Sequence, residues 1–467
     1  MINSYMLFDK KYIHLSTSLF FKLLINVFMV FYIAKRVTVA DFGSFSIAFV
    51  VASLTTLCLD YGFNLKALVL TSKSNEEINE ELSSMIFSKI ILTTMAFFCF
   101  LLFSFLTSYN NTTYLVILIL TASAVPTSFG NFYLNNFKII NRFDKEANGY
   151  IIQGSCLLIM LILNHYYGYN DIIYYALILL LVRFIYMTYG FLSFRETFFK
   201  LYSFNFKKAL NSIKTAAPYG IHLILGASII YIDTFILALI SNLENVGLYQ
   251  AGMRIIMASM LIAVIISDAF IPEISKAYED KKVVTKKLSR LFEFILLFCG
   301  LTTITLYFYK QTIILLLFSE EYLPIESSIL LVIAIIILRY IGIVPGIILT
   351  SYGKQVIRAK AVVVSIIFSV VFNLILIPLY NIEGAFVASL LAHVVLNIIY
   401  VFYAQRTVIF TKNISLSLLI SILIIGYSFQ IIFFKDSKLF LLITILLNVI
   451  MVFVYFKIIN RKNKNET

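Results

Sequence analysis

The sequence predicts an all-α integral membrane protein with about fourteen transmembrane helices. Three observations carry this prediction. Hydrophobic residues form 61% of the 467 residues and charged residues only 13%, whereas a soluble domain carries about 25% charge. Mean hydropathy is +0.94. Apolar runs of about 20 residues recur from Ser16 to Phe456, and they are continuous rather than alternating, which favours helices over strands.

The apolar runs place each expected span and leave little chain for anything else. Spans of about 22 residues would use roughly 308 residues in total, so no soluble catalytic domain fits and we do not expect an enzyme. The expected spans are 14–34, 43–65, 84–107, 113–137, 149–167, 172–194, 215–238, 248–272, 288–309, 326–350, 358–380, 384–404, 414–434 and 438–457.

The loops between these spans alternate in positive charge. Net charge is +13, which in a soluble protein would suggest nucleic acid, but here the charge lies in loops that orient the chain. With the amino terminus inside, 27 Lys and Arg fall on the inner side and five on the outer side. We therefore predict that both termini are cytoplasmic, in a bacterial inner membrane, with no nucleic-acid partner.

A hydrophilic break and a weak internal repeat divide the chain into two lobes. Shifting the chain by 204 residues aligns Gly43 with Gly247, and shifting it by 219 aligns Pro126 with Pro345. We expect two pseudo-symmetric six-helix lobes around a central cleft, with two extra carboxy-terminal helices. The divisions are an N-lobe at 1–194, a cytoplasmic inter-lobe linker at 195–214, a C-lobe at 215–405, and accessory spans with a basic tail at 406–467.

Basic residues inside spans are the first candidate site residues. A charge at the bilayer centre costs about 2.5–3.5 kcal/mol, so these side chains must face a partner or a wet cavity unless they snorkel. Lys22, Arg183 and Arg339 lie near mid-span, and Arg254 lies closer to an outer end. Lys89 is near an inner end, and we expect it to snorkel.

Polar residues recur at helical spacing on the first helix of each lobe. On the first span the stripe is His14, Ser18, Lys22 and Asn26. On the seventh it is Thr215, Tyr219, His222, Gly226 and Asp233. Residues three, four and seven apart share a helix face, so both stripes are expected to line the central cleft.

The balance of charges inside the spans favours an anionic passenger. Acidic groups there are fewer, chiefly Asp233, Asp268 and Glu293. A carboxylate in a low-dielectric cleft can change its charge with what occupies the cleft, so Asp233, with His222 and Asp268, is a candidate for proton or sodium coupling. The alternative, that these carboxylates only neutralise the basic residues, stays open.

Motifs of catalysis are absent from the sequence. There is no phosphate-binding glycine loop and no His or Cys cluster with metal-ligand spacing. We therefore predict no catalytic residues, no metal and no cofactor. The expected outer loops, at most about 16 residues long, are too short to hold the catalytic groups of a membrane glycosyltransferase or polymerase.

Short segments in order along the chain resemble a known family. They are SLFFKLLIN at 18–26, YIAKR at 32–36, DFGSF at 41–45, DYGFN at 60–64, VGLY at 246–249 followed by Arg254, LFSEEY at 317–322 and GAF at 384–386. Together they resemble the polysaccharide-transport branch of the MOP exporter superfamily, whose fold is MATE-like, and the Wzx-type O-antigen flippases within it.

This resemblance implies an alternating-access flippase. Such a protein would move an undecaprenyl-pyrophosphate-linked O-antigen or related repeat unit across the inner membrane, with membrane lipids, a polysaccharide polymerase and chain-length machinery as candidate partners. The main alternative is a cation-coupled small-molecule or multidrug exporter of the MATE kind. A pathway for cationic drugs should be dominated by carboxylates, and Lys22, Arg183, Arg254 and Arg339 argue against it.

The charge asymmetry makes a topology test possible. Reporter fusions after Asn170 and Asn242 should read as periplasmic, and fusions after Lys208 and Lys282 as cytoplasmic, because the positive loops remain inside. Paired alkaline phosphatase and fluorescent-protein fusions provide the measurement. A periplasmic readout at Lys208 would refute the division into two six-helix lobes.

Overall fold

The computed structural model describes residues 10–68, 70, 74–106, 109–198, 205–276 and 280–408. Within these ranges the regular elements are helices, so the predicted all-α class is confirmed. The chain forms two compact units, unit 1 (Met1–Tyr231) and unit 2 (Ile232–Thr467), which are described separately below. The expected spans 414–434 and 438–457 lie outside the described residues.

The described helices follow one another with short connections. They are α1 (Lys10–Ala34), α2 (Val39–Asp60), α3 (Phe63–Leu68), α4 (Asn75–Leu106), α5 (Asn111–Ala122), α6 (Ala124–Asn135), α7 (Phe143–Tyr167), α8 (Ile172–Thr197), α9 (Phe206–Ile240), α10 (Leu243–Lys276), α11 (Lys281–Phe308), α12 (Lys310–Leu317), α13 (Ile329–Ser351) and α14 (Gln355–Gln405), with 3₁₀ helices η3 (Asn136–Ile140) and η4 (Glu320–Ser328). Ten helical stretches of the described chain are long and apolar enough to cross a membrane. The protein is therefore a multi-pass membrane protein.

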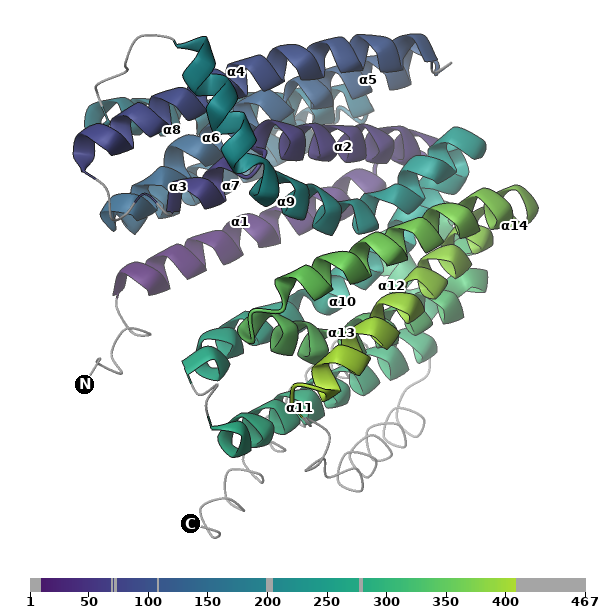
Figure 1. Ribbon diagram of the computed structural model, residues 1–467. Coiled ribbons are helices and arrows are strands. Elements are labelled where there is room, and N and C mark those ends of the chain that lie inside the picture. The colour runs from purple at the N-terminus through teal and green to yellow at the C-terminus, as the bar shows by residue number, and fades with distance from the viewer. Residues whose placement is uncertain are drawn as a thin grey trace. The chain divides into compact units, whose positions relative to one another are not determined.

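In unit 1, helices that run in the same direction pack in pairs (Figure 1). Close contacts join α1 to α7, α2 to α5, and α6 to α8. Small residues allow the paired helices to approach each other closely. A Cβ at Gly154 of α7 would come within 2.8 Å of the Phe21 ring, so glycine lets α7 approach α1 closely. This approach brings the middle of α1, with Lys22, against α7.

The second expected span is divided by a tight turn. Tyr61 has φ of 37° and Gly62 has φ of 76°, both left-handed, so α2 ends and the short α3 continues in a new direction. A Cβ at Gly62 would also lie 2.5 Å from Cβ of Tyr219 on α9. Glycine is required here both by its backbone conformation and by the close approach of α9.

The fourth expected span, 113–137, is two helices rather than one. The helix breaks at Ser123, between α5 and α6, and η3 follows α6. Pro126 has no backbone N–H and cannot donate to the carbonyl of residue 122, which explains a break at this point. Such breaks are tolerated inside a membrane protein when side chains satisfy the freed backbone groups.

Unit 2 contains a hairpin that the sequence predicted as two spans, 358–380 and 384–404. The 51 residues of α14 comprise two helices joined across a kink. A single straight helix of that length would extend about 75 Å, far more than a bilayer core of about 30 Å. The chain instead turns at Asn381, where φ is 46° and ψ is −121°. A Cβ at Gly384 would lie 2.3 Å from the Leu376 carbonyl oxygen, so the turn depends on glycine.

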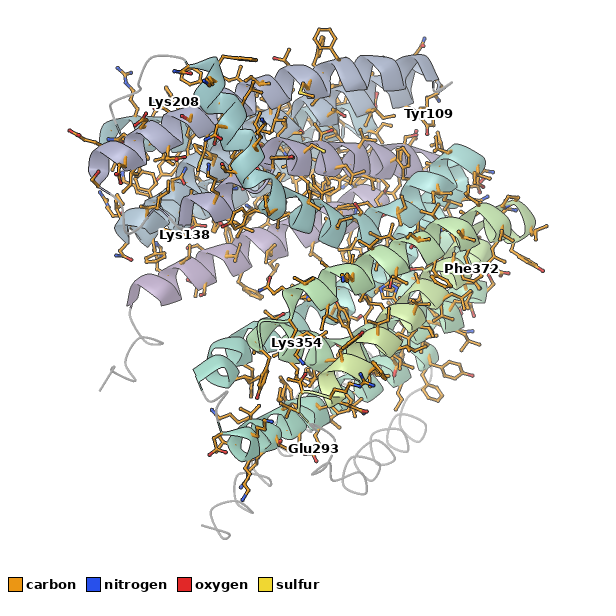
Figure 2. The ribbon with its side chains drawn as sticks, in the orientation of Figure 1. Tyr109, Lys138, Lys208, Glu293, Lys354 and Phe372 are labelled. Atoms are coloured by element: carbon orange, nitrogen blue, oxygen red, sulfur yellow. The ribbon has the colours of Figure 1, made fainter. Side chains whose placement is uncertain are left out.

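The described loops of unit 1 agree with the predicted sidedness. Lys138 and Lys208, both expected inside, lie toward one end of the unit, and Tyr109, expected outside, lies toward the other (Figure 2). Membrane spans that follow one another in the chain therefore alternate in direction, as the charge pattern requires. Orientation relative to the cell stays a prediction.

The expected linker 195–214 is more helical than a linker. α8 continues to Thr197 and α9 begins at Phe206, because the positions after 205 already have the apolar spacing of α9. The contact-defined units meet within α9, between Tyr231 and Ile232. The amino-terminal three quarters of α9 therefore belong to unit 1, and the lobe boundary at 195–214 stays a prediction.

Candidate functional site

A cluster of polar side chains lies among the apolar helices of each unit around a residue that the sequence predicts as a site residue. In unit 1, Lys22 lies among Glu146, Tyr150, Arg183 and Tyr186, a set we name the Lys22 centre. In unit 2, Asp233 lies among Tyr249, Arg339, Ser369 and Asn373, which we name the Asp233 centre. Both centres contain residues that the sequence had selected and residues that it had not.

Aromatic rings surround the ammonium group of Lys22. Its Nζ lies 4.5 Å from the ring centroid of Tyr150 and 5.3 Å from that of Tyr186. A ring face attracts a cation while leaving its hydrogen-bond donors unused. The predicted position near mid-span, away from lipid, is consistent with this environment.

Glu146 is the nearest carboxylate of the Lys22 centre, but it is engaged elsewhere. Its Oε1 lies 2.9 Å from Lys138 Nζ and accepts a hydrogen bond from the Tyr150 hydroxyl at 2.6 Å. Glu146 is 1% exposed and interacts with Lys22 only through space. The carboxylate therefore holds Tyr150 in place and lowers the cost of the Lys22 charge without forming an ion pair with it.

Arg183 of α8 reaches the break between α5 and α6. Its Nη1 donates a hydrogen bond to Ser123 Oγ, and its guanidinium lies 5.9 Å from the Phe49 ring centroid. Arg183 is also an electrostatic neighbour of Lys22. The structure thus brings together the two basic candidates of unit 1, and neither belongs to an ion pair identified among the described residues.

Lys89 does not snorkel, and that prediction is wrong. Its side chain is 0% exposed, and Nζ donates to Asp60 Oδ1 at 3.0 Å, to the Leu59 carbonyl at 3.0 Å and to Ser128 Oγ. The rings of Phe63, Phe129 and Phe132 lie around it. Full hydrogen bonding inside a protein competes with snorkelling, because it satisfies all three ammonium protons at once. Lys89 is therefore a structural cation.

The carboxylate of the Asp233 centre is held by neutral donors. Asp233 is 2% exposed. Its Oδ1 accepts hydrogen bonds from Ser369 Oγ and from Asn373 Nδ2 at 2.7 Å, and its Oδ2 accepts one from the Tyr249 hydroxyl at 3.2 Å. Buried charges are ordinarily neutralised by a partner ion or by a proton. The described contacts of Asp233 supply hydrogen bonds but no ion pair.

Arg339 lies within electrostatic range of Asp233 and Tyr249. Its Nη1 is buried without a hydrogen-bond partner in the described part of the chain. His393 is an electrostatic neighbour of Arg339 and is bonded by Nδ1 to the Ser389 carbonyl at 2.8 Å. A guanidinium with an unused donor next to a carboxylate can accept an anion or alternate between partners.

The other site residues predicted from the sequence are Arg254, His222, Asp268 and the rest of the polar stripe on α1. Arg254 of α10 contacts Met257 Sδ at 3.8 Å through Nη1. The side chains of His222 and Asp268 lie outside the described residues, so their coupling role stays a prediction. In the α1 stripe, His14 contacts Asn148 and Lys22 contacts Tyr150, both on α7, while Ser18 and Asn26 bond to the backbone of α1 itself.

Sequence reasoning missed the donors around Asp233. Ser365, Ser369 and Asn373 recur every fourth residue on α14 and are all buried. This polar stripe has the same spacing as the stripe that identified Lys22, and it was visible in the sequence. Among the described residues, no group of three or more His, Cys, Asp or Glu could hold a metal ion.

Comparison with known proteins identifies the family. A profile described as "Polysaccharide biosynthesis protein" matches residues 8–278, more than half of the chain. The capsular polysaccharide biosynthesis protein CapF of Staphylococcus aureus is 27% identical over 46% of this chain and 50% of its own length. A probable low-salt glycan biosynthesis flippase, Agl15, of Haloferax volcanii is 22% identical over 38% of each chain. The chain thus spans half or less of the curated relatives it matches.

Solved structures share the fold. The lipid II flippase MurJ, in an inward closed conformation, superposes with a TM-score of 0.74 at 19% identity, covering 96% of this chain and 99% of its own. A multidrug resistance MATE transporter of the MOP superfamily, in an inward-facing conformation, has a TM-score of 0.63 at 14% identity, covering 88% and 99%. The MATE-like fold predicted from the sequence is confirmed.

Proposed function

Because this chain belongs to the polysaccharide biosynthesis protein family and has the fold of MOP-superfamily transporters, we propose that it is a flippase for a lipid-linked glycan. The family match is the observation that carries the proposal. The cargo we propose is an undecaprenyl-pyrophosphate-linked repeat unit of an O-antigen or related surface polysaccharide. It would cross the inner membrane from the cytoplasmic leaflet by alternating access, with both termini of the protein cytoplasmic.

The chemistry of the two centres supports an anionic cargo over a cationic drug. Lys22 is held by ring faces and Arg339 has an unused donor, so both can offer positive charge to an incoming group. Of the carboxylates beside them, Asp233 is bound through both oxygens and Glu146 through Oε1. A cationic drug would need carboxylates that are free to receive it.

We propose that Lys22, Arg183, Arg254 and Arg339 each contact the pyrophosphate at some stage of its path. A pyrophosphate that leaves water needs replacement hydrogen bonds, which guanidinium groups supply in pairs and an ammonium supplies as a mobile point charge. Binding must also be reversible. Charges spread along the path meet that requirement better than one tight site, and those of Lys22 and Arg183 are already partly compensated by rings or a hydroxyl.

We also propose that Asp233 is the coupling residue, with His222 and Asp268 as further candidates. The Asn373 amide oxygen is buried without a hydrogen-bond partner in the described part of the chain, close to the Asp233 carboxylate that its own amide nitrogen contacts. Carboxylate, amide and hydroxyl oxygens suit a proton or a hard monovalent cation. Occupancy of Asp233 would change the net charge beside Arg339.

The cargo proposal predicts the phenotype of gene deletion and of single neutralisations. Deletion should stop surface polysaccharide and trap lipid-linked single repeat units on the cytoplasmic side. Complementation by Lys22→Gln or Arg339→Gln should lower polysaccharide about 10- to 100-fold, the effect of losing one charged hydrogen bond, at unchanged protein abundance. Lys22→Arg should keep partial function. Lys310→Gln, which removes a cation outside the spans that pairs with Glu326, is the control and should be silent.

Two outcomes would contradict these assignments. Normal surface polysaccharide in the deletion strain, with no paralogue to substitute, would reject the flippase. Recovery of abundance and transport in the double variants Lys22→Gln/Glu146→Gln or Arg339→Gln/Asp233→Asn would show that each basic residue serves only to balance the charge of the neighbouring carboxylate. The anion role of those residues would then be wrong.

The coupling proposal has its own test in the variant Asp233→Asn, which keeps the shape and removes the charge. Transport by this variant should lose its dependence on pH or on sodium, because the group that binds the coupling ion is gone. Glu293→Gln, which neutralises another buried carboxylate of unit 2, should keep that dependence. Unchanged transport with unchanged pH and sodium dependence in Asp233→Asn would exclude the coupling role.

A further inference from the structure

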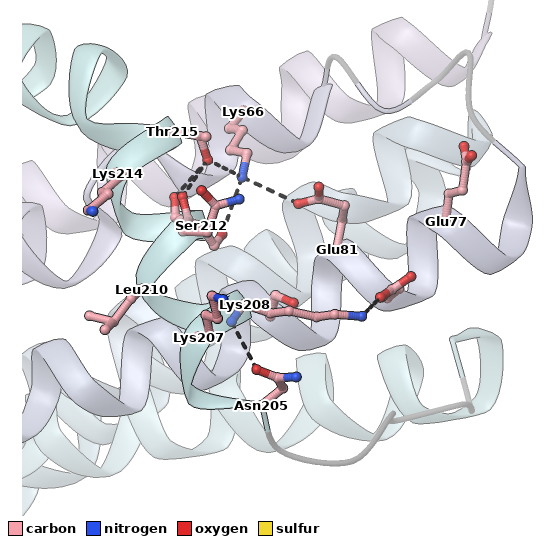
Figure 3. A pocket seen from close by; sticks show the side chains of 13 residues that line it. Lys66, Glu77, Glu81, Asn205, Lys207, Lys208, Leu210, Ser212, Lys214 and Thr215 are labelled. Atoms are coloured by element: carbon pink, nitrogen blue, oxygen red, sulfur yellow. Dashed lines mark hydrogen bonds and ion pairs between the residues drawn. The ribbon is translucent and has the colours of Figure 1, made fainter.

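An acidic cluster at the start of α4 is unusual for a loop that the charge pattern places inside. Glu76, Glu77, Glu80 and Glu81 interrupt an otherwise basic side of the protein. Three of them line a cavity of about 750 Å³ within unit 1, with Lys66 of α3 and with Lys207, Lys208 and Lys214 of α9 (Figure 3). The cavity separates the α4 glutamates from the first turns of α9.

Lys66 connects the three helices that line this cavity. Its Nζ donates to Glu81 Oε2 at 3.3 Å on α4, and to Ser212 Oγ at 3.2 Å and Thr215 Oγ1 at 2.8 Å on α9. One ammonium group therefore joins three helices, with one proton for each acceptor. A second tie lies beside it, where Lys208 of α9 pairs with Glu80 of α4.

Neutral contacts extend the interface below the cavity. Ser88 of α4 is fully buried, and its Oγ donates to the Ala209 carbonyl of α9 at 2.9 Å. Further along α9, a Cβ at Gly220 would lie 2.9 Å from the Tyr61 carbonyl oxygen. The segment of α9 from Phe206 to Gly220, which we name the α9 arm, is thus seated on α2, α3 and α4.

The electrostatic ties of the arm are of a kind that forms and breaks easily. The side chains of Lys208 and Glu80 are 56% and 43% exposed, and Glu81 is 34% exposed. Water in the cavity competes with such pairs, so each adds little net stability. The arm is therefore held by several weak ties rather than by one strong one.

The α9 arm belongs to a helix that continues into unit 2. α9 is one continuous helix, but the contact-defined boundary between the units falls within it, at Tyr231–Ile232. Asp233 lies just beyond that boundary on the same helix. A change in the arrangement of the units must therefore either bend α9 or free its arm from unit 1.

We propose that the α9 arm is a reversible cytoplasmic latch, which closes on α3 and α4 around this cavity. Lys66, through Ser212 and Thr215, and Lys208, through Glu80, hold the arm down in one state of the transport cycle, and the arm leaves unit 1 in another. The proposal rests on the transport function proposed above. The acidic start of α4 then has a role, because Glu80 binds Lys208 of α9 and Glu81 binds Lys66 of α3.

Cross-linking tests whether release of the arm is needed. In a background with Cys58, Cys99, Cys156 and Cys299 replaced by Ser, the pair Glu80→Cys/Lys208→Cys is joined by a reducible bifunctional thiosulfonate. Transport of the lipid-linked saccharide should be lost on cross-linking and return on reduction. The control pair Arg36→Cys/Asn170→Cys, which also joins distant segments of unit 1, should transport equally in both states. Full transport by the cross-linked Glu80/Lys208 pair would overturn the latch.

A labelling measurement tests release without using the cargo. In the same background, Ser88→Cys lies beneath the arm and reacts with a water-soluble maleimide only when the arm lifts. Adding Lys66→Met should raise the labelling rate about 2- to 5-fold, as expected for the loss of partly exposed polar ties. Adding Lys214→Met, a lysine of the same arm that points away from the glutamates in Figure 3, should not.

The two measurements separate the latch from the function. Equal labelling rates in the Lys66→Met and Lys214→Met backgrounds would overturn the latch whatever the protein carries. Faster labelling with Lys66→Met, in a protein that moves no lipid-linked saccharide, would support the latch and reject the proposed cargo.

Discussion

The cost of placing charge in a bilayer governs this structure. A charged side chain at the bilayer centre costs several kcal/mol unless the protein replaces the lost water. A chain with 13% charged residues that still buries Lys89, Asp233 and Glu146, and half-buries Lys22, must compensate each of them separately. The way in which each charge is compensated distinguishes residues that hold the fold from residues that can meet a cargo.

The charges of Lys89 and Lys22 are compensated in two opposite ways. Lys89 uses its three protons on a carboxylate, a carbonyl and a hydroxyl, and it is sealed by aromatic rings. Removing one partner of such a buried pair costs about 3–5 kcal/mol, so it is suited to holding α2, α4 and α6 together. Lys22 instead rests on the rings of Tyr150 and Tyr186, and its hydrogen-bonding capacity is not consumed there. The first arrangement is closed, whereas the second can respond to an anion.

Much of this could be predicted from the sequence, because span length and loop charge follow directly from the bilayer. The first, sixth and seventh expected spans fall on α1, α8 and α9. Local turns were harder to predict. The break at Ser123 and the left-handed Tyr61–Gly62 turn depend on which side chains satisfy the backbone, which periodicity does not report.

The site residues, too, could be predicted from the sequence only in part. Mid-span position was sufficient to select Lys22, Arg183 and Asp233, since a charge there always requires an explanation. It failed for Lys89, because the choice between snorkelling and an internal ion pair depends on Asp60 and Ser128, which lie on other helices. The neutral donors Ser369 and Asn373 carry no charge to attract notice, and only their fourfold spacing could have identified them.

We propose that this protein moves an anionic lipid-linked saccharide rather than a cationic solute. The most direct test is flipping by the purified protein in liposomes loaded with a fluorescent undecaprenyl-pyrophosphate-linked oligosaccharide, read out by its exposure to an external quencher. We predict exchange between leaflets faster than in protein-free liposomes, competition by unlabelled lipid-linked pyrophosphate and no competition by ethidium. Uptake of ethidium by these vesicles, with no movement of the saccharide, would contradict the account.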